Sequence, residues 1–197
     1  PLLTVGETKI VGRGFRPDVN AFDFNEERYG HRVPGILDGI GAYKLNNRTV
    51  RFLANHELTR SSGYAYTLAN GTEVTGARVS YFDVGRWNLR LQGTGLAYDT
   101  IYDRAGAEVI DAAQIGGGIN RLCSSYSFKA GEGGLKDNVY FTGEETFGGT
   151  EYALDVDDHA IYAAPMMGRA AWENVCLVEN FSSDKVVIMV GDDRGGA

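Results

Sequence analysis

Short β-prone segments recur along this chain, and residues that favour turns separate them. Runs of about four to eight apolar, aromatic and β-branched residues between Gly, Asn and Asp are typical of antiparallel strands joined by hairpins. The segments are residues 41–45, 50–55, 77–83, 95–102, 138–142, 151–156, 160–163, 175–179 and 185–190. Gly-rich stretches at 116–118 and 130–134 flank a further strand around Cys123. The pattern predicts an all-β fold.

Composition supports this prediction. Glycine contributes 27 of 197 residues, about twice its usual share of about 7%, and it is dispersed as many tight turns require. The aromatic residues, 11 Tyr, 9 Phe and 2 Trp, favour strands and bury large surfaces. A chain of this length can bury enough surface to fold without disulfides. We therefore expect one compact unit.

Several turns have a clear local cause. Asn46–Asn47 and Asp157–Asp158 each separate two β-prone runs, and Asn and Asp tolerate the positive φ of a tight hairpin. Residues 103–106 divide two more runs in the same way. Residues 111–115 and 165–171 lack a sustained helical period, so we expect a few short helical turns there.

Antiparallel meanders of this kind fit a β-propeller or a sandwich. A propeller blade takes about 40 to 45 residues, so the chain has room for about four blades at most. Residues 1–36 do not alternate and predict an irregular N-terminal segment, followed by blades over 37–197. The first residue is Pro1 and the last residues resemble an interior turn, which predicts a longer parent protein.

Charge and hydropathy exclude two classes of partner. The chain has 26 acidic and 19 basic residues, a net charge of −7, and its charged stretches mix both signs. Because Lys and Arg contacts to phosphates dominate nucleic-acid affinity, a nucleic-acid partner is not expected. No stretch reaches the roughly 18 apolar residues of a membrane-spanning helix, so no transmembrane segment is expected.

The cysteines and histidines give no motif. Cys123 and Cys176 can form a disulfide or remain as two thiols, and two cysteines do not decide between these. His56 can ligate a metal, transfer a proton or be structural, whereas His31 and His159 lie among polar residues and are expected to be exposed. No zinc-type spacing, nucleophile elbow or phosphate loop is present.

Acidic residues follow the β-prone segments at four places in the sequence. Carboxylates at strand ends that meet in a propeller channel would need a cation, and oxygen ligands suit Ca²⁺. The alternative is that each is a solvated turn residue. Arg169 and Arg194 lie near two of these places and can bind phosphate or pair with acids. The acidic residues are Glu57, Glu144, Glu145, Glu173, Asp192 and Asp193.

The ordered motifs resemble the PhoX-type alkaline phosphatase family, secreted or periplasmic bacterial β-propellers with a metal cluster in the central channel. The match runs from about residue 32 to the end of the chain. The matching stretches are PGILDG at 34–39, NHE at 55–57, ARVSYFD at 77–83, FTGEET at 141–146, GRAAWEN at 168–174 and GDDR at 191–194.

This resemblance implies a phosphoesterase in which iron and calcium hold and polarise the phosphate. Carried over by position, the metal ligands are Glu57, Glu144, Glu145, Glu173 and Asp193. Glu57, Glu144, Arg169 and Arg194 are the candidate catalytic residues. It also implies a periplasmic or secreted location, and a chain that covers about half of a propeller. The remainder would then be a second chain or further subunits.

One position departs from the family pattern. Gly143 stands where the resemblance leads us to expect a Cys that ligates iron, immediately before the Glu-Glu pair. Loss of a thiolate favours Ca²⁺ over Fe³⁺. Two hypotheses follow: a metal-dependent hydrolase of phosphate monoesters, or a non-catalytic, calcium-stabilised extracellular propeller with a structural, filament or adhesion role.

Overall fold

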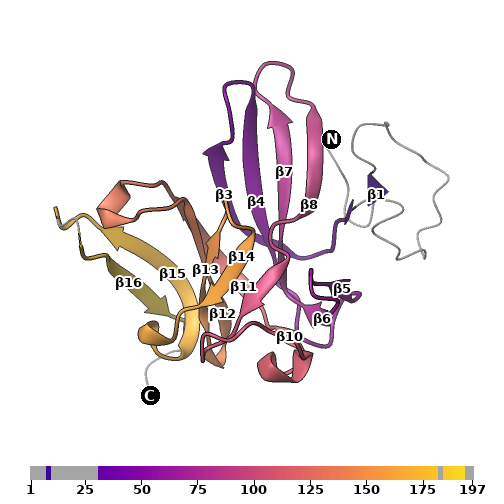
Figure 1. Cartoon of the computed structure of the whole chain (residues 1–197), viewed down its shortest axis with the longest axis vertical. Helices are drawn as coiled ribbons and strands as arrows, with labels where there is room; N and C mark the ends of the chain where they lie inside the picture. Colours follow the sequence, from indigo (N-terminus) through magenta and orange to yellow (C-terminus); the bar gives the residue numbers. More distant parts are fainter. Residues whose placement is uncertain (1–7, 10–30, 182–183, 194–197) are drawn as a thin grey trace.

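Two sheets that meet where β3 lies against β11 contain most of the described strands (Figure 1). The structure is a computed structural model and describes residues 8–9, 31–181 and 184–193. The first sheet is an antiparallel meander in the order β3-β4-β7-β8. Its strands are β3 (Leu37–Lys44), β4 (Thr49–His56), β7 (Arg78–Gly85) and β8 (Leu91–Leu96).

The second sheet has the order β16-β15-β12-β13-β14-β9, and β11 also pairs with β12. All its pairings are antiparallel except that of β14 with β9, which is parallel. The strands are β9 (Thr100–Tyr102), β11 (Leu122–Phe128), β12 (Val139–Gly149), β13 (Glu151–Asp155), β14 (Ala160–Ala163), β15 (Ala170–Val178) and β16 (Val187–Asp192).

Smaller elements complete the described fold. A third sheet has the order β10-β6-β5, and β1 pairs with β2. The strands of the third sheet are β5 (Tyr66–Thr67), β6 (Glu73–Gly76) and β10 (Gly118–Ile119). The separate pair consists of β1 (Thr8–Lys9) and β2 (His31–Arg32). The short 3-10 turns are η1 (Ala112–Ile115), η2 (Glu132–Gly134) and η3 (Pro165–Met167).

The predicted mostly β, antiparallel fold is confirmed, and so are the local turns. The 46–47 turn joins β3 to β4, and the 157–158 turn joins β13 to β14. Asp111 caps η1 by accepting the backbone N–H of Ala113, as its position before the turn leads one to expect. The predicted strand 95–102 is wrong in one respect, because it breaks between β8 and β9.

Glycines bring the two sheets together at β3. A Cβ at Gly39 would lie 2.6 Å from the carbonyl oxygen of Cys123, and one at Gly41 would lie 2.8 Å from the ring of Tyr140. Since these distances are shorter than side-chain contacts allow, the close approach requires glycine at both positions. The first sheet therefore rests directly on the backbone of β11.

A buried polar residue links the sheets at the same place. The side-chain N–H₂ of Asn55 donates to the carbonyl of Cys123 and to Thr142 Oγ1, the latter at 2.8 Å. Its side-chain oxygen accepts from the Tyr140 hydroxyl at 2.8 Å. Asn55 is fully buried, so these bonds satisfy a group that would otherwise be costly to bury. They fix β11 against β4 next to Cys123.

The described sheets form no closed barrel or propeller. Most of the predicted N-terminal segment 1–36 lies outside the described residues, and its described part includes the β1–β2 pair. Cys123 is buried and Cys176 exposed, and both are free thiols. Within the described residues no helix is long and apolar enough to cross a membrane.

Candidate metal centre

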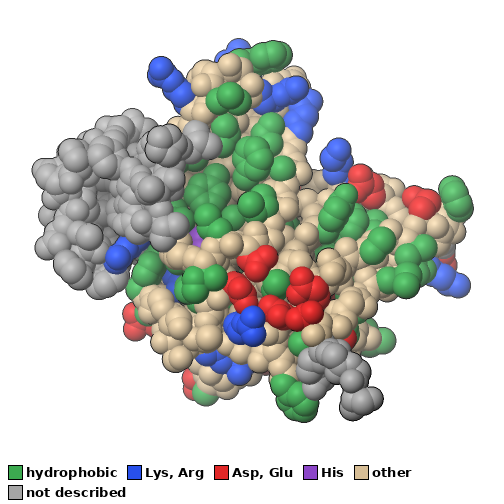
Figure 2. All heavy atoms as spheres, turned by 180° about the vertical axis from the view of Figure 1, so that it is seen from behind, with side chains coloured by type: hydrophobic (Ala, Val, Ile, Leu, Met, Phe, Trp, Pro, Cys, Tyr) green, Lys and Arg blue, Asp and Glu red, His purple; other side chains and the backbone are tan. Residues whose placement is uncertain are grey.

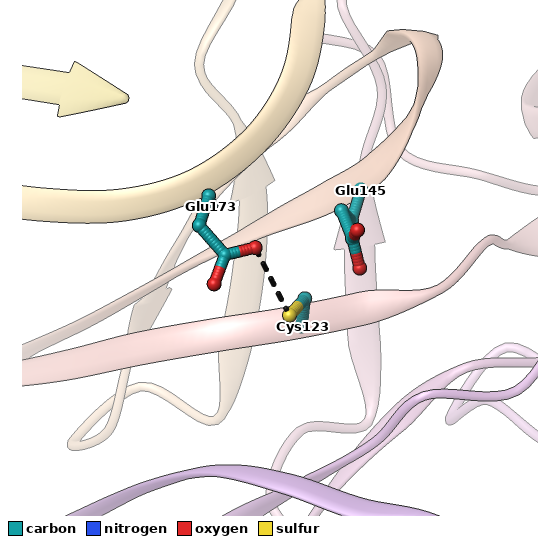
Figure 3. Close-up of side chains that lie close together, drawn as sticks. All are labelled: Cys123, Glu145 and Glu173. Carbon is teal, nitrogen blue, oxygen red and sulfur yellow. Dashed lines mark hydrogen bonds between the residues drawn. The ribbon is translucent and has the colours of Figure 1, made fainter. Parts of the chain in front are cut away.

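Three potential metal ligands from three strands lie close together. Cys123 on β11, Glu145 on β12 and Glu173 on β15 each offer one ligand atom, and these atoms are within 4.8 Å of one another. Figure 3 shows the three side chains converging, with Cys123 Sγ donating to Glu173 Oε2 at 3.4 Å. Asp38 on β3 joins them, because its Oδ2 also lies 3.4 Å from Cys123 Sγ.

Irregular strand pairing accompanies all four of these residues. The β3–β4 register shifts between Leu37 and Ile40, and the β11–β12 register shifts between Leu122 and Ser125. The β12–β15 register shifts after Glu145, and the β15–β16 register shifts between Trp172 and Val175. A bulge changes the direction in which a side chain points. Strand irregularities thus direct side chains from two sheets to one place.

Arg121 connects this group to two further carboxylates. It donates to Glu57 Oε1 through Nε at 2.8 Å and through Nη2 at 2.6 Å, and to Glu145 Oε2 at 3.0 Å. Asp193, after β16, is close enough to the Glu145 carboxyl group to raise its pKa. We call Asp38, Glu57, Cys123, Glu145, Glu173 and Asp193 the acidic cluster. Figure 2 shows acidic side chains gathered on one face of the molecule.

The charges of the acidic cluster are poorly balanced. The acidic cluster contains five carboxyl groups and one thiol, and among the described residues Arg121 is the basic side chain that pairs with it, through Glu57 and Glu145. Burial raises the pKa of Glu145, and the neighbouring Asp193 raises it further. Burial and then the neighbouring Asp38 raise the pKa of the Cys123 thiol well above its ordinary value. A bound cation would offset this repulsion.

The structure places Glu144 elsewhere. Successive residues of a strand point to opposite faces, and Glu144 is buried on the side of β12 away from Glu145. Its carboxylate accepts the backbone N–H of Asn120 at 2.8 Å and of Thr150 at 2.9 Å, and it pairs with Arg60 at 3.3 Å. Of the five predicted ligands, Glu57, Glu145, Glu173 and Asp193 come together and Glu144 does not.

The two predicted arginines do not join the acidic cluster. Arg169 Nη1 donates to the carbonyl of Gly148 at 2.9 Å, and its side chain lines the same cavity as Glu144. Arg194 lies outside the described residues.

Gly143 has no room for the cysteine that the family resemblance led us to expect. A Cβ there would collide with the Cβ of Trp172 and with Glu151 Oε2. The thiol in the acidic cluster comes instead from Cys123, about twenty residues earlier, which sequence reasoning did not select. Asp38 and Arg121 were missed too. Asp38 lies within one of the motif stretches, whereas no spacing signal marks Cys123 or Arg121.

His31 and His56 are buried, and their ring nitrogens lie within hydrogen-bonding distance of groups that belong to the fold. His56 Nε2 and His31 Nε2 lie 2.7 Å and 2.8 Å from the hydroxyl of Ser80, and His56 Nδ1 lies 3.1 Å from the carbonyl of Gly35. Burial lowers the pKa of His31 to about 3 and that of His56 to about 4. The expectation that His31 is exposed is wrong, whereas His159 is exposed as predicted.

Comparison with known proteins found no matching family model, no matching curated protein and no matching solved structure. The resemblance to the PhoX-type family therefore rests on the sequence motifs alone, and the activity that it implies stays a prediction.

Proposed function

We propose that this chain is part of a PhoX-like, metal-dependent phosphoesterase with a β-propeller fold. The observation that carries the proposal is the convergence of Cys123, Glu145 and Glu173 within 4.8 Å, beside Asp38. Asp38, Glu145 and Glu173 lie in stretches that match the family. Strand pairing places β11, β12 and β15 side by side, and the register shifts at these residues turn the three ligand groups to one place. A shared metal centre needs such an arrangement.

The donor types fit the metals that the resemblance implies. Carboxylate oxygens from Asp38, Glu145 and Glu173 are hard ligands that suit Ca²⁺, and a deprotonated Cys123 is a soft ligand that suits iron. The thiol of Cys123 thus offsets the absence of a ligand at Gly143, which was the argument against Fe³⁺. Bound cations would act as Lewis acids on the phosphoryl oxygens of a substrate.

Arg121 is the residue of this chain best placed to orient a phosphate ester. Its Nε and Nη2 atoms are held by Glu57 and Glu145, and its side chain is 41% exposed. No described residue accepts from Nη1, so that end of the guanidinium is available to a phosphate oxygen. Glu57 fixes the orientation of Arg121 and raises its pKa by accepting two of its hydrogen bonds.

Metal content and turnover of a phosphate monoester test the proposal. We expect the protein to bind Ca²⁺ and iron and to hydrolyse 4-nitrophenyl phosphate when both are supplied. Replacing Glu145 with Gln should reduce bound metal and lower kcat/KM by about 100-fold or more, since it removes a charged ligand. Glu73→Gln is the matched control, because Glu73 is an exposed glutamate outside the acidic cluster. Metal binding without any turnover by the complete protein would refute the phosphoesterase.

The second candidate is a non-catalytic extracellular propeller stabilised by calcium. This candidate is favoured because the residues of the acidic cluster belong to both sheets. They lie on β3, β11, β12 and β15 and at the ends of β4 and β16. A cation there would join both sheets irrespective of catalysis. This role is supported if calcium raises the melting temperature and no phosphate ester is hydrolysed.

Both candidate functions imply the same larger assembly and the same location. The chain would contribute about half of a propeller, and the remainder would come from the parent protein, a second chain or further subunits. The resemblance favours a periplasmic or secreted location.

A further inference from the structure

We infer that this protein has a second ligand site, a cavity that binds a phosphate-type oxyanion through Arg60, Arg104 and Arg169. The cavity lies on the other side of β12 from the acidic cluster, since Glu144 lines it and Glu145 belongs to the cluster. The inference does not depend on the proposed function.

The cavity has a volume of about 390 Å³. Residues from separate parts of the chain line it: the loop between β4 and β5 with Arg60, the turn after β9, η1 and its flank, β12 and β13 with their junction, and the segment before β15. The turns η1 and η3 lie at the same end of the molecule in Figure 1. Ligand pockets generally have volumes of about 300 to 1,000 Å³, so the space suits a small molecule.

Backbone carbonyls hold the three guanidinium groups in place. Arg104 donates to Gly168 O at 3.0 Å and to Pro165 O at 3.3 Å. Arg169 donates to Gly148 O at 2.9 Å, and Arg60 donates to Gly118 O at 2.8 Å. Each guanidinium has five N–H donors, and these contacts use one or two of them. The arginines are thus pre-oriented and retain donors for a ligand.

The acidic residues of the cavity have their oxygens occupied. Both Glu144 oxygens accept backbone N–H groups, and one also pairs with Arg60. Asp103 Oδ1 accepts from Ala105 N at 2.8 Å and from Ala107 N at 3.0 Å, and Oδ2 accepts from Gln114 Nε2 at 3.2 Å. Three arginines against two carboxylates leave an excess of positive charge. An anionic ligand would balance this excess.

The arrangement of the donors favours a tetrahedral oxyanion. A guanidinium presents a planar pair of N–H groups that matches two oxygens of a phosphate. Here three such groups come from three separate segments around one space, so several oxygens of one phosphate can be bound at once. The remaining volume has room for a small organic group attached to that phosphate.

Titration calorimetry with inorganic phosphate, at low ionic strength and in the presence of EDTA, tests this site. EDTA removes metal ions from the acidic cluster, so failure of this site and failure of the phosphoesterase proposal remain distinguishable. We expect saturable binding that weakens about tenfold in Arg104→Gln and about tenfold in Arg169→Gln, as the loss of one charge-assisted contact predicts. Both arginines contact only backbone carbonyls among the described residues, so both variants should keep the wild-type melting temperature.

Arg86→Gln is the matched control, because Arg86 is an exposed arginine after β7, on the other sheet. It should bind phosphate as the wild type does. An equal loss in Arg86→Gln would overturn the inference, because the effect would then be one of overall charge. Absence of binding up to millimolar phosphate, or unchanged binding in both cavity variants, would overturn it too. Tighter binding of succinate, a dicarboxylate, than of phosphate would overturn the assignment to a tetrahedral, phosphate-type oxyanion.

Discussion

Glu151 is a buried acid that has no charged partner among the described residues. Its side chain is 2% exposed, it lies opposite Gly143 in the β12–β13 pairing, and no described residue hydrogen-bonds to its Oε1. Burial raises its pKa to about 8. The carboxyl group is therefore protonated at neutral pH in the folded protein and ionised in the unfolded chain.

This difference makes stability depend on pH. Between the ordinary pKa of 4.5 and about 8, the folded state binds more protons than the unfolded state, so the free energy of unfolding falls as pH rises. The slope from one such group approaches about 1.4 kcal/mol per pH unit. We expect Glu151→Gln, which cannot ionise, to lose this slope. Urea unfolding at pH 5, 6.5 and 8 measures it, and Glu73→Gln is the exposed control. An identical slope in Glu151→Gln and wild type would contradict the prediction.

The buried histidines act in the opposite direction. His31 and His56 have pKa values lowered to about 3 and 4 from 6.5. Below pH 6.5 the unfolded chain therefore binds more protons, and stability falls as pH decreases. We expect His56→Gln to make unfolding less pH-dependent between pH 4 and 6.5, whereas His159→Asn, at an exposed position, should leave that dependence unchanged. Urea unfolding at pH 4, 5 and 6.5 measures it, and equal dependence in wild type and His56→Gln would refute it.

At the scale of elements, β12 separates two chemical environments. Regular alternation gives Glu144 and Glu145 opposite faces, which the sequence pattern makes predictable in principle. Which face would meet the thiol was not predictable, because it depends on β11 and on register shifts at Cys123 and Glu145. A register shift arises from packing between strands, and no residue type in the sequence marks it.

Packing around β12 also excludes a side chain at Gly143. We expect Gly143→Ala to destabilise the protein by about 1 to 3 kcal/mol, the usual cost of overpacking, because the methyl group would collide with Trp172 and Glu151. Gly191→Ala is the matched strand control, since a Cβ there would be in ordinary contact, 3.8 Å from Asn174 Cβ. Chemical denaturation of both variants measures the difference. Equal stability would show that β12 and β15 can separate to admit a side chain.

At the scale of the whole molecule, the acidic cluster takes its carboxyl groups from both sheets, so like charges lie where the two sheets meet. We expect Ca²⁺ to raise the melting temperature relative to EDTA by roughly 5 to 10 °C at about 100 times Kd. Glu173→Gln should reduce this shift and leave stability in EDTA equal or higher, because it removes one repelling charge. Scanning calorimetry measures both values, and Glu73→Gln should behave as the wild type. A calcium-independent transition would contradict a role of the cluster in stability.

The sequence predicted the local structure better than the long-range structure. Hairpins such as 46–47 and 157–158 were predictable because the turn residues themselves favour the conformation. Cys123 was not selected as a ligand, because its approach to Asp38 depends on Gly39 and Asn55, which bring β11 against the first sheet. Its approach to Glu173 depends on the register shifts within the second sheet. Arg169 was expected to lie near the carboxylates and either bind phosphate or pair with acids, and the structure places it in the cavity that it lines with Arg60, Arg104 and Glu144.

The parallel pairing of β14 with β9 determines the order in which the second sheet can form. Thr100 pairs with Ala160 and Tyr102 with Tyr162, and β10 to β13 lie between these strands in the sequence. During synthesis β9 leaves the ribosome early and has no partner in this sheet until residue 163 follows. Such non-local pairing closes a long loop and slows folding. The second sheet should thus be the slow step of folding, whereas the β3-β4-β7-β8 meander can form as soon as it is made.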